Sequence, residues 1–413
     1  MTGAASNLPA VSGTRLLDRL ERLARVGAID GGGCRRLALT DEDRAGRDLV
    51  TGWMRDLGLA VTVDAIGNVV GVRPGLEDGP PVMTGSHIDT VATGGRYDGC
   101  LGVLAGLEVV QTLNEAGITT RKPLAVGVFT NEEGARFAPD MMGSAVHQGS
   151  LALDEALDAR DRDGVRVGDA LARIGYAGPE PVGAQRAAAF VELHIEQGPV
   201  LDREGIAIGA VTGVQGISWT EVVVEGVSNH AGTTPMDLRR DAAYAAAALA
   251  VEVRAIATRL GPPQVGTVGV IVPEPNLINV VARRATLTVD LRNTDDAVLQ
   301  RAEALLADAI DRLAAAEGVG ITTRRLARFA PVPFDPAVVE LVERTARGLG
   351  LTVRRLPSGA GHDAQMFAPN APTGMIFVPS RDGISHNVAE HTDPAQLEAG
   401  ANVLLRVLLD LAA

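Results

Sequence analysis

The chain has 413 residues, of which 46% are hydrophobic and 22% charged, and its formal net charge is −13. A chain of this length favours two or more domains, and its composition argues against a long disordered protein. The negative charge argues against a nucleic-acid partner, because phosphates are bound by Lys and Arg.

The cysteines and the N-terminus bear on where the protein acts. The two cysteines, Cys34 and Cys100, form neither a CxxC metal motif nor a disulfide framework, which favours a reducing compartment. Residues 1–10 lack a basic patch followed by an apolar run, so we expect no signal peptide. No apolar run approaches the ~18 residues of a membrane span. We therefore expect a cytoplasmic protein with no membrane partner.

The outer parts of the chain alternate between helical and extended patterns. Residues 1–60 look helical, with leucines at positions 16, 17, 20 and 23. The predicted strands are residues 81–84, 124–130, 190–195 and 375–378, and a helix is predicted at 99–113. Strands that alternate with helices are typical of an open α/β sheet.

The middle of the chain has a different pattern. Residues 219–227 and 285–293 alternate like strands with one buried face, and each precedes a helix, at 241–260 and 298–315. Two such units predict an inserted α+β domain, which we place at residues 213–327. Residues 1–212 and 328–413 then form one mixed-sheet catalytic domain, of the α/β class.

Several histidines and carboxylates come at the ends of the predicted strands. His87 follows the first strand, Glu132 and Glu133 follow the second, and His194 lies in the third. In open α/β sheets, sites form at the carboxyl ends of strands, so we expect these side chains to meet there. Two adjacent carboxylates raise each other's pKa unless a cation lies between them. The pattern therefore favours a metal site.

Asp98 and His386 complete this metal site in the sequence. Asp98 lies in a glycine-rich turn and His386 in a turn near the end of the chain. Each residue alone is compatible with an ordinary role, such as a helix cap for Asp98 or a core position for His194. Together they form a His/Asp/His set and an Asp/Glu/His set that share Asp98. Oxygen and imidazole ligands suit zinc, manganese, cobalt or nickel, so we expect two divalent metal ions per subunit.

Five motifs resemble the hydantoinase/carbamoylase family of binuclear metal amidases, within the wider aminoacylase and carboxypeptidase clan. The resemblance covers roughly residues 15–410. The motifs are residues 84–90 (TGSHIDT), 94–99 (GGRYDG), 130–134 (TNEEG), 192–198 (ELHIEQG) and 358–364 (SGAGHDA). At position 194 the chain has a histidine and so resembles the carbamoylase branch, because the aminopeptidase-like branches have an acidic ligand at this position.

The resemblance implies a role for each residue of the metal centre. One metal ion would be bound by His87, Asp98 and His194, and the other by Asp98, Glu133 and His386. Glu132 would be the catalytic base, and Asp89 would orient His87.

The resemblance also implies how a substrate binds. The inserted domain would be a lid that forms a homodimer, and its His230 would reach a neighbouring subunit's site and polarise the scissile carbonyl. Asn279 and Arg292 would bind the substrate carboxylate, which suits the planar fork of arginine. The residues that contact substrate from the catalytic domain would be Gln197, Gly361 and His362. His147 and His391 receive no role and are interpreted as surface residues.

The activity implied is hydrolysis of N-carbamoyl-L-amino acids to the amino acid, ammonia and carbon dioxide. Allantoate amidohydrolase and β-ureidopropionase are alternatives, because their substrates also combine a ureido group with a carboxylate. An aminoacylase or dipeptidase is a further alternative, and so is a non-catalytic binding protein of the same fold. The complete ligand set together with Glu132 argues against the last of these.

Overall fold

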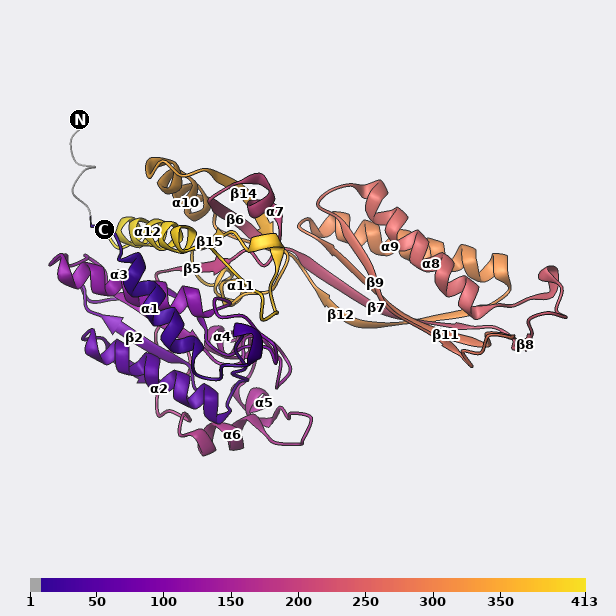
Figure 1. Cartoon of the computed structure of the whole chain (residues 1–413), viewed down its shortest axis with the longest axis horizontal. Helices are drawn as coiled ribbons and strands as arrows, with labels where there is room; N and C mark the ends of the chain where they lie inside the picture. Colours follow the sequence, from indigo (N-terminus) through magenta and orange to yellow (C-terminus); the bar gives the residue numbers. More distant parts are fainter. Residues whose placement is uncertain (1–8) are drawn as a thin grey trace. The chain divides into compact units, whose positions relative to one another are not determined.

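The computed structural model describes residues 9–413, so the expectation about a signal peptide falls mainly on residues 1–8, outside this range. The chain divides into two compact units. One comprises the described residues up to Gly213 together with Pro333–Ala413, and the other is Val214–Val332 (Figure 1). The sequence analysis placed the two boundaries after residues 212 and 327.

The first unit is built on a mixed sheet of nine strands within the described residues, in the order β1-β2-β4-β3-β5-β15-β6-β13, with β14 paired to β6. Its centre is parallel, since β3 pairs in parallel with β4 and β5, and β5 with β15. The strands are β1 Ala60–Val63, β2 Val69–Arg73, β3 Val82–His87, β4 Leu124–Phe129, β5 Ala189–Ile195, β6 Ile208–Val214, β13 Val332–Pro333, β14 Val353–Ser358 and β15 Thr373–Val378.

Helices cover both faces of this sheet. Leu193 of β5 packs beside Gly400 of α12, while Phe190 stacks on Phe367 of α11 at 3.9 Å between ring centroids. Residues 190 and 193 of one strand point to opposite faces, so α11 and α12 lie on opposite sides. The helices are α1 Gly13–Ala24, α2 Asp41–Asp56, α3 Cys100–Glu115, α4 Met142–Gln148, α5 Leu153–Asp158, α6 Val167–Ile174, α7 Val200–Glu204, α10 Pro336–Gly348, α11 Asp363–Phe367 and α12 Pro394–Leu411, with short 3-10 turns η1 Asp30–Gly32 and η3 Arg381–Gly383.

The second unit has a four-stranded antiparallel sheet, in the order β12-β7-β11-β9, and a separate β8–β10 pair. Alternate residues of β11 are buried, including Leu287, Val289 and Leu291, and they form a core with helices α8 and α9. The elements are β7 Gly216–Glu225, β8 Asn229–His230, β9 Val265–Glu274, β10 Val280–Val281, β11 Arg284–Asn293, β12 Gly320–Phe329, α8 Ala242–Leu260, α9 Asp296–Glu317 and the 3-10 turn η2 Met236–Leu238.

The predicted α/β class and mixed sheet are confirmed, and most predicted elements lie within a few residues of their observed bounds. The expectation of a helical first 60 residues is only partly right. Residues 25–40 separate α1 from α2 without an α-helix, because Gly27, Gly31 and Gly32 adopt positive φ angles that favour glycine.

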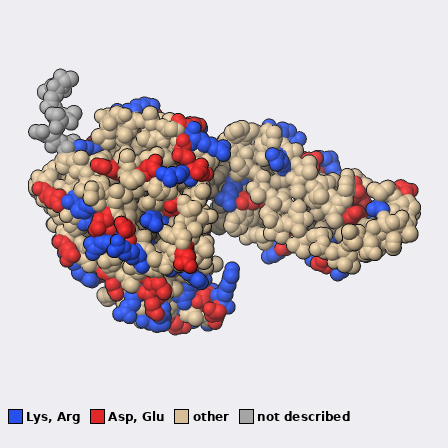
Figure 2. Space-filling view, viewed as in Figure 1, with Lys and Arg blue, Asp and Glu red and all other residues tan. Residues whose placement is uncertain are grey.

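The surface and the helix lengths bear on the expected partners. On the face drawn in Figure 2, basic and acidic side chains are interspersed, and no large single-sign patch stands out. Among residues 9–413, none of the helices combines the length and the apolar character that crossing a membrane requires. 

Candidate metal centre

Two neighbouring parallel strands present the first two histidines. His87 is the last residue of β3, and His194 is the penultimate residue of β5. The register pairs Thr84 with Val191, and its continuation sets His87 opposite His194. Their ring centroids are 6.1 Å apart. Because both rings stand at the carboxyl edge of the sheet, a third group can bridge them.

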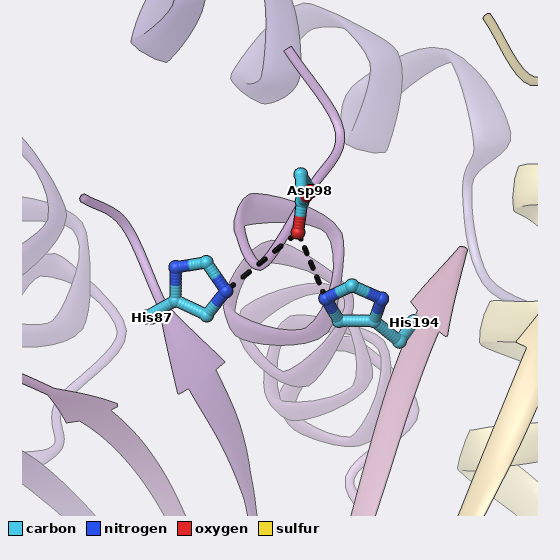
Figure 3. A group of neighbouring side chains, drawn as sticks. All are labelled: His87, Asp98 and His194. Atoms are coloured by element: carbon cyan, nitrogen blue, oxygen red, sulfur yellow. Dashed lines mark ion pairs between the residues drawn. The ribbon is translucent and has the colours of Figure 1, made fainter. Parts of the chain in front are cut away.

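Asp98 is that third group (Figure 3). Its Oδ1 lies 3.1 Å from Nε2 of His194 and 3.7 Å from Nε2 of His87. Its Oδ2 lies 3.4 Å from Nε2 of His386, which is also 3.2 Å from Oε2 of Glu133. The donor atoms within each of the two sets lie within 4.8 Å of one another. The structure therefore brings together all five residues proposed as ligands, with Asp98 common to both sets.

The position of Asp98 is fixed from three sides. Its Oδ2 accepts hydrogen bonds from Nε2 of Gln197 at 2.9 Å and from Oγ of Ser385 at 3.1 Å. Its backbone N–H donates to Oε1 of Glu390 at 3.2 Å. Burial alone would raise the pKa of Asp98, but hydrogen bonds with His194 and His386 outweigh it and hold this pKa well below the usual range. Asp98 is therefore an ionised carboxylate.

The buried histidines are oriented as metal ligands usually are. Nδ1 of His87 donates to the carbonyl oxygen of Asp89, and Nδ1 of His194 donates to that of Ile195, both at 2.9 Å. Each ring thus turns its Nε2 toward Asp98, which is the arrangement that outer hydrogen bonds impose on a metal-bound imidazole. The hydrogen bond with Asp98 raises the pKa of His194 to about 9 against the opposing effect of burial. A divalent ion would displace this proton.

This donor set fits a pair of divalent ions. It consists of three imidazoles and two carboxylates, one of them shared. His87 and His194 come from strands β3 and β5, and the other three residues come from loops. In a further group, Glu192, His194 and His362, the donor atoms also lie within 4.8 Å of one another. Its atoms already have protein partners, since Glu192 accepts from Ser86 and Ala364 and His362 bonds Ser358. We therefore assign no ion to it.

Asp89 has a different contact from the one that the sequence predicts. Its carboxylate lies 3.9 Å from Nδ1 of His87, and its backbone carbonyl makes the shorter contact. The carboxylate instead accepts the backbone N–H groups of Glu132 at 3.2 Å and Glu133 at 3.3 Å. Asp89 thus ties the loop after β4 to the end of β3, and burial is the main cause that raises its pKa to about 8.

Glu132 lies beside the ligands but belongs to neither set. Its Oε2 is 3.2 Å from Nε2 of His87, and only 8% of the residue is exposed. Burial, followed by the charges of Asp363 and Glu133, raises its pKa well above the usual range. A carboxyl group with a raised pKa can accept a proton and release it again, as a general base and acid require.

Backbone strain accompanies these contacts. Asn131, Gln197 and His386 have φ angles of 56°, 57° and 53°, in the left-handed region that non-glycine residues rarely adopt. Each is either a predicted site residue or the neighbour of one. Strain of this kind persists only where surrounding contacts hold it, and it is concentrated at functional sites.

The cavity at the centre has a volume of about 110 Å³. The predicted residues that line it are His87, Asp98, Glu132, Glu133, His194, Gln197, Gly361, His362 and His386. Asp140 and Ala360 also line it, and sequence reasoning missed both. Asp140 follows an ordinary loop sequence, so no motif indicated it. His362 is buried, with its ring centroid 4.5 Å from that of His194.

The other three predicted site residues belong to the second unit. His230 is in β8, and its neighbour Ala231 donates to the carbonyl of Asn279 at 3.0 Å, so His230 and Asn279 lie close together. Arg292 lies on β11 in the four-stranded sheet, where its Nη2 is 2.9 Å from Oδ2 of Asp290.

Comparisons with known proteins agree with this fold and site. The model of Peptidase family M20/M25/M40, a family of metal-dependent hydrolases, matches residues 83–410, and the two ligand sets fit such an enzyme. The chain therefore belongs to this family. The resemblance to the hydantoinase/carbamoylase amidases is confirmed as well, since an amidase of that family from Burkholderia multivorans has a TM-score of 0.95 and 47% identity, with 98% of each chain covered.

Curated relatives are similar over nearly their whole length. The N-carbamoyl-L-amino-acid amidohydrolase of Rhizobium meliloti is 43% identical over 403 residues, covering 97% of each chain. The corresponding enzyme of Geobacillus stearothermophilus is 42% identical, covering 97% of this chain and 99% of its own. The allantoate amidohydrolase of Bacillus subtilis is 36% identical, covering 96% and 97%.

Proposed function

We propose that this protein is a binuclear metal-dependent amidohydrolase that cleaves the carbamoyl C–N bond of N-carbamoyl-L-amino acids. The products would be the free amino acid, ammonia and carbon dioxide. Two relatives that carry this activity in their names are 42–43% identical, against 36% for the allantoate enzyme of Bacillus subtilis. The two ligand sets that share Asp98 supply the metal centre that such a reaction needs.

The hydrogen bonding of Gln197 is the main reason for proposing a ureido substrate. Its Nε2 donates to the carboxylate of Asp98, which fixes the amide so that Oε1 is the free acceptor. Oε1 is buried and has no hydrogen-bond partner among the described residues. A carbamoyl group ends in an NH2 that can donate to this oxygen, whereas the acyl group of an N-acetyl amino acid ends in a methyl. An unpaired acceptor of this kind favours the substrate that satisfies it.

The two ions, zinc or else manganese, cobalt or nickel, would supply a water of lowered pKa and polarise the scissile carbonyl. Residues His87, Asp98 and His194 would hold one, and Asp98, Glu133 and His386 the other. Glu132 would take the proton of the attacking water and deliver it to the leaving nitrogen. The raised pKa of Glu132 suits the second step, because the protonated form persists until the nitrogen departs. The two bound cations would lower this pKa and so favour the carboxylate that the first step needs.

His230 would polarise the carbonyl as a neutral hydrogen-bond donor. Its Nδ1 accepts the backbone N–H groups of Gly232 at 3.0 Å and Thr233 at 3.2 Å. A nitrogen that accepts these bonds carries no proton, so the proton of the neutral ring lies on Nε2. Asn279 and Arg292 would bind the substrate carboxylate, and Gly361 and His362 would contact the substrate from the first unit.

We further propose that the second unit is a lid that forms a homodimer. Strand β9 is at the edge of its sheet, and Val270, Ile271 and Val272 are 44–52% exposed. An exposed apolar edge strand of this kind is a template on which a strand of another chain can pair. The free, buried cysteines Cys34 and Cys100 support a cytoplasmic site of action.

The test is metal removal followed by reconstitution. Protein stripped with a chelator would be loaded with zinc, manganese, cobalt or nickel and assayed for ammonia release from N-carbamoyl-L-amino acids, N-carbamoyl-β-alanine and allantoate. We expect activity only with metal and the highest kcat/KM on N-carbamoyl-L-amino acids. Highest activity on allantoate or N-carbamoyl-β-alanine would replace the proposed substrate by that one. No ammonia release with any metal would refute the enzyme proposal.

A Gln197→Met variant tests the ureido argument separately. Methionine has a similar volume but cannot accept the carbamoyl N–H, so kcat/KM on N-carbamoyl substrates should fall about tenfold or more. The matching N-acetyl amino acid should lose less, because its methyl group never used Gln197. Equal losses on both substrates would remove Gln197 as the residue that selects the ureido group.

A further inference from the structure

A second cavity in the first unit is larger than the one at the metal centre. Its volume is about 520 Å³, within the usual size range of small-molecule sites. Its walls come from residues 146–149 at the end of α4, from residues 182–188 before β5, and from residues 367–371 after α11. We call it the Arg186 cavity. None of the proposed metal ligands or substrate-binding residues lines it.

The charge of the Arg186 cavity is positive. Arg186 is its one charged lining residue, and no aspartate or glutamate lines it. Within the described residues, Arg186 is exposed and forms no salt bridge with a carboxylate, so its guanidinium can bind a ligand. A guanidinium recognises a carboxylate through two parallel hydrogen bonds. The cavity therefore favours an organic anion.

His147 lines this cavity and holds a hydrogen-bond acceptor, unpaired within residues 9–413, just behind its wall. The sequence analysis interpreted His147 as a surface residue, but it is only 7% exposed. Its Nε2 donates to the carbonyl of Gln185 at 3.2 Å, which leaves Nδ1 as the acceptor. Nδ1 is buried and has no hydrogen-bond partner in the described chain. Burial lowers the pKa of His147, which keeps the ring neutral.

We propose that the Arg186 cavity is a second ligand site that binds an α-amino acid and thereby changes turnover at the metal centre. The carboxylate would pair with Arg186, and the side chain would lie against Val146 and Phe367. The amino group would donate to Nδ1 of His147 after a small shift of the ring exposes this buried atom to the cavity. An α-amino acid is also the product of the proposed reaction, and this link between ligand and product rests on the proposed function. The binding chemistry rests only on the lining residues.

Contacts from the cavity lead to the catalytic loop. Helix α4 carries His147. Met141, the residue that precedes this helix, donates its backbone N–H to the carbonyl of Glu132 at 2.7 Å. The ring of His147 lies 5.9 Å from Phe129, the last residue of β4, and 5.6 Å from Phe367 of α11. A ligand that shifts His147 therefore acts on the two segments that flank Glu132.

Binding would be measured by equilibrium dialysis of the metal-loaded protein with L-phenylalanine as the probe. L-phenylalaninamide lacks the carboxylate and 3-phenylpropionate lacks the amino group, so both should bind at least about tenfold more weakly. Arg186→Ala should weaken L-phenylalanine binding by a similar factor. Arg162→Ala is the matched control, since Arg162 is also an exposed arginine of this unit but does not line the cavity.

The Arg292→Ala variant distinguishes binding in the Arg186 cavity from binding in the substrate site. Binding that is lost in Arg186→Ala and kept in Arg292→Ala supports the second site. Binding that is lost only in Arg292→Ala means that the amino acid occupies the substrate site, which overturns the inference and leaves the proposed function intact. Added L-phenylalanine should also change kcat for N-carbamoyl substrates, and Arg186→Ala should abolish that change. Purely competitive inhibition that persists in Arg186→Ala would refute the coupling.

If the protein releases no ammonia from any substrate, the proposed function fails, but the dialysis measurement still decides whether the Arg186 cavity binds an amino acid. Equal binding by the unmodified protein, Arg186→Ala and Arg162→Ala would overturn the site itself.

Discussion

Replacing Arg36 with methionine should weaken metal binding as well as the fold. Arg36 is 1% exposed, and its Nε donates to the carbonyl of Ile88 at 2.7 Å. Ile88 lies between His87 and Asp89, so this hydrogen bond holds the backbone that presents both. The Nη2 of Arg36 lies 3.1 Å from Sγ of Cys100, the first residue of α3, two positions after Asp98. One guanidinium thus connects the end of the β3 segment that carries His87 with the segment that carries Asp98.

The stability cost follows from the contacts of Arg36. Its guanidinium donates to the carbonyls of Ile88, Leu23 and Val26 at 2.7–3.0 Å. Bonds to a charged group contribute about 1.5–3 kcal/mol each, which gives a gross loss of about 5–9 kcal/mol. Within the described residues, no carboxylate lies within salt-bridge distance of Arg36, so removing the buried cation returns several kcal/mol. We expect a net loss of about 2–4 kcal/mol.

The assay separates metal binding from stability. Metal affinity would be measured by competition with a chelator, and stability by urea unfolding of the metal-free protein. Arg36→Met should lose about 10–100-fold in metal affinity, as changes behind metal ligands do. Glu108→Gln is the control, because Glu108 is a buried residue of α3 that pairs with Arg15 at 2.6 Å and Arg19 at 3.2 Å, away from the ligands. It should be destabilised with unchanged metal affinity. Unchanged affinity in Arg36→Met, or an equal loss in Glu108→Gln, would refute this reasoning.

Three further predictions test the site and the fold. Glu132→Gln should keep its metal content but lose about 10²–10⁴-fold in turnover, and preserved ammonia release would remove Glu132 as the base. Arg292→Ala should raise KM for carboxylate substrates about tenfold or more. Arg324→Ala is the control and should leave KM unchanged, because Arg324 is an exposed, ion-paired arginine of the same unit. Equal kinetics in both variants would argue against a role of Arg292 in binding the carboxylate. Burial raises the pKa of Asp64 from 3.8 to about 6, so its carboxylate lowers stability above pH 6 and ceases to do so as the pH falls toward 4. Between pH 5 and pH 7.5, the free energy of urea unfolding should therefore fall by about 1.4 kcal/mol more than in Asp64→Asn, and an equal fall in both proteins would contradict the assignment.

The sequence predicts the buried centre of the fold better than its edges. Both faces of β4 and β5 are covered, so β4 is a continuous apolar run and β5 is apolar except for Glu192 and His194. Each was predicted within one residue of its observed bounds. Strand β12 was not predicted, since none of its residues is fully buried and Arg324 and Arg325 interrupt any apolar pattern. Strand β9 was missed as well, because it is exposed along most of its length. At a sheet edge, pairing with the neighbouring strand decides the structure, and hydrophobic periodicity does not report it.

The same limit applies to the site. His87, Glu133 and His194 could be placed because each follows or ends a recognisable strand. The residues that hold Asp98 could not, since Glu390 meets its backbone N–H across 292 positions of the sequence and Ser385 lies in a turn without a motif. Asp89 shows a subtler limit. The sequence indicates its proximity to His87, but only the structure reveals that its carboxylate binds the backbone of the Glu132 loop.

The arrangement of the nine-stranded sheet has a consequence for biosynthesis. Strand β15 lies between β5 and β6, although some 160 residues separate it from them in the chain, and the second unit is made in between. While the ribosome is still translating that unit, the nascent first unit has a gap at the centre of its sheet and lacks His386. Two unpaired strand flanks are then open to wrong partners. A chaperone that shields β5 and β6 during this interval should therefore raise the yield of active protein, and metal insertion should follow translation of β15.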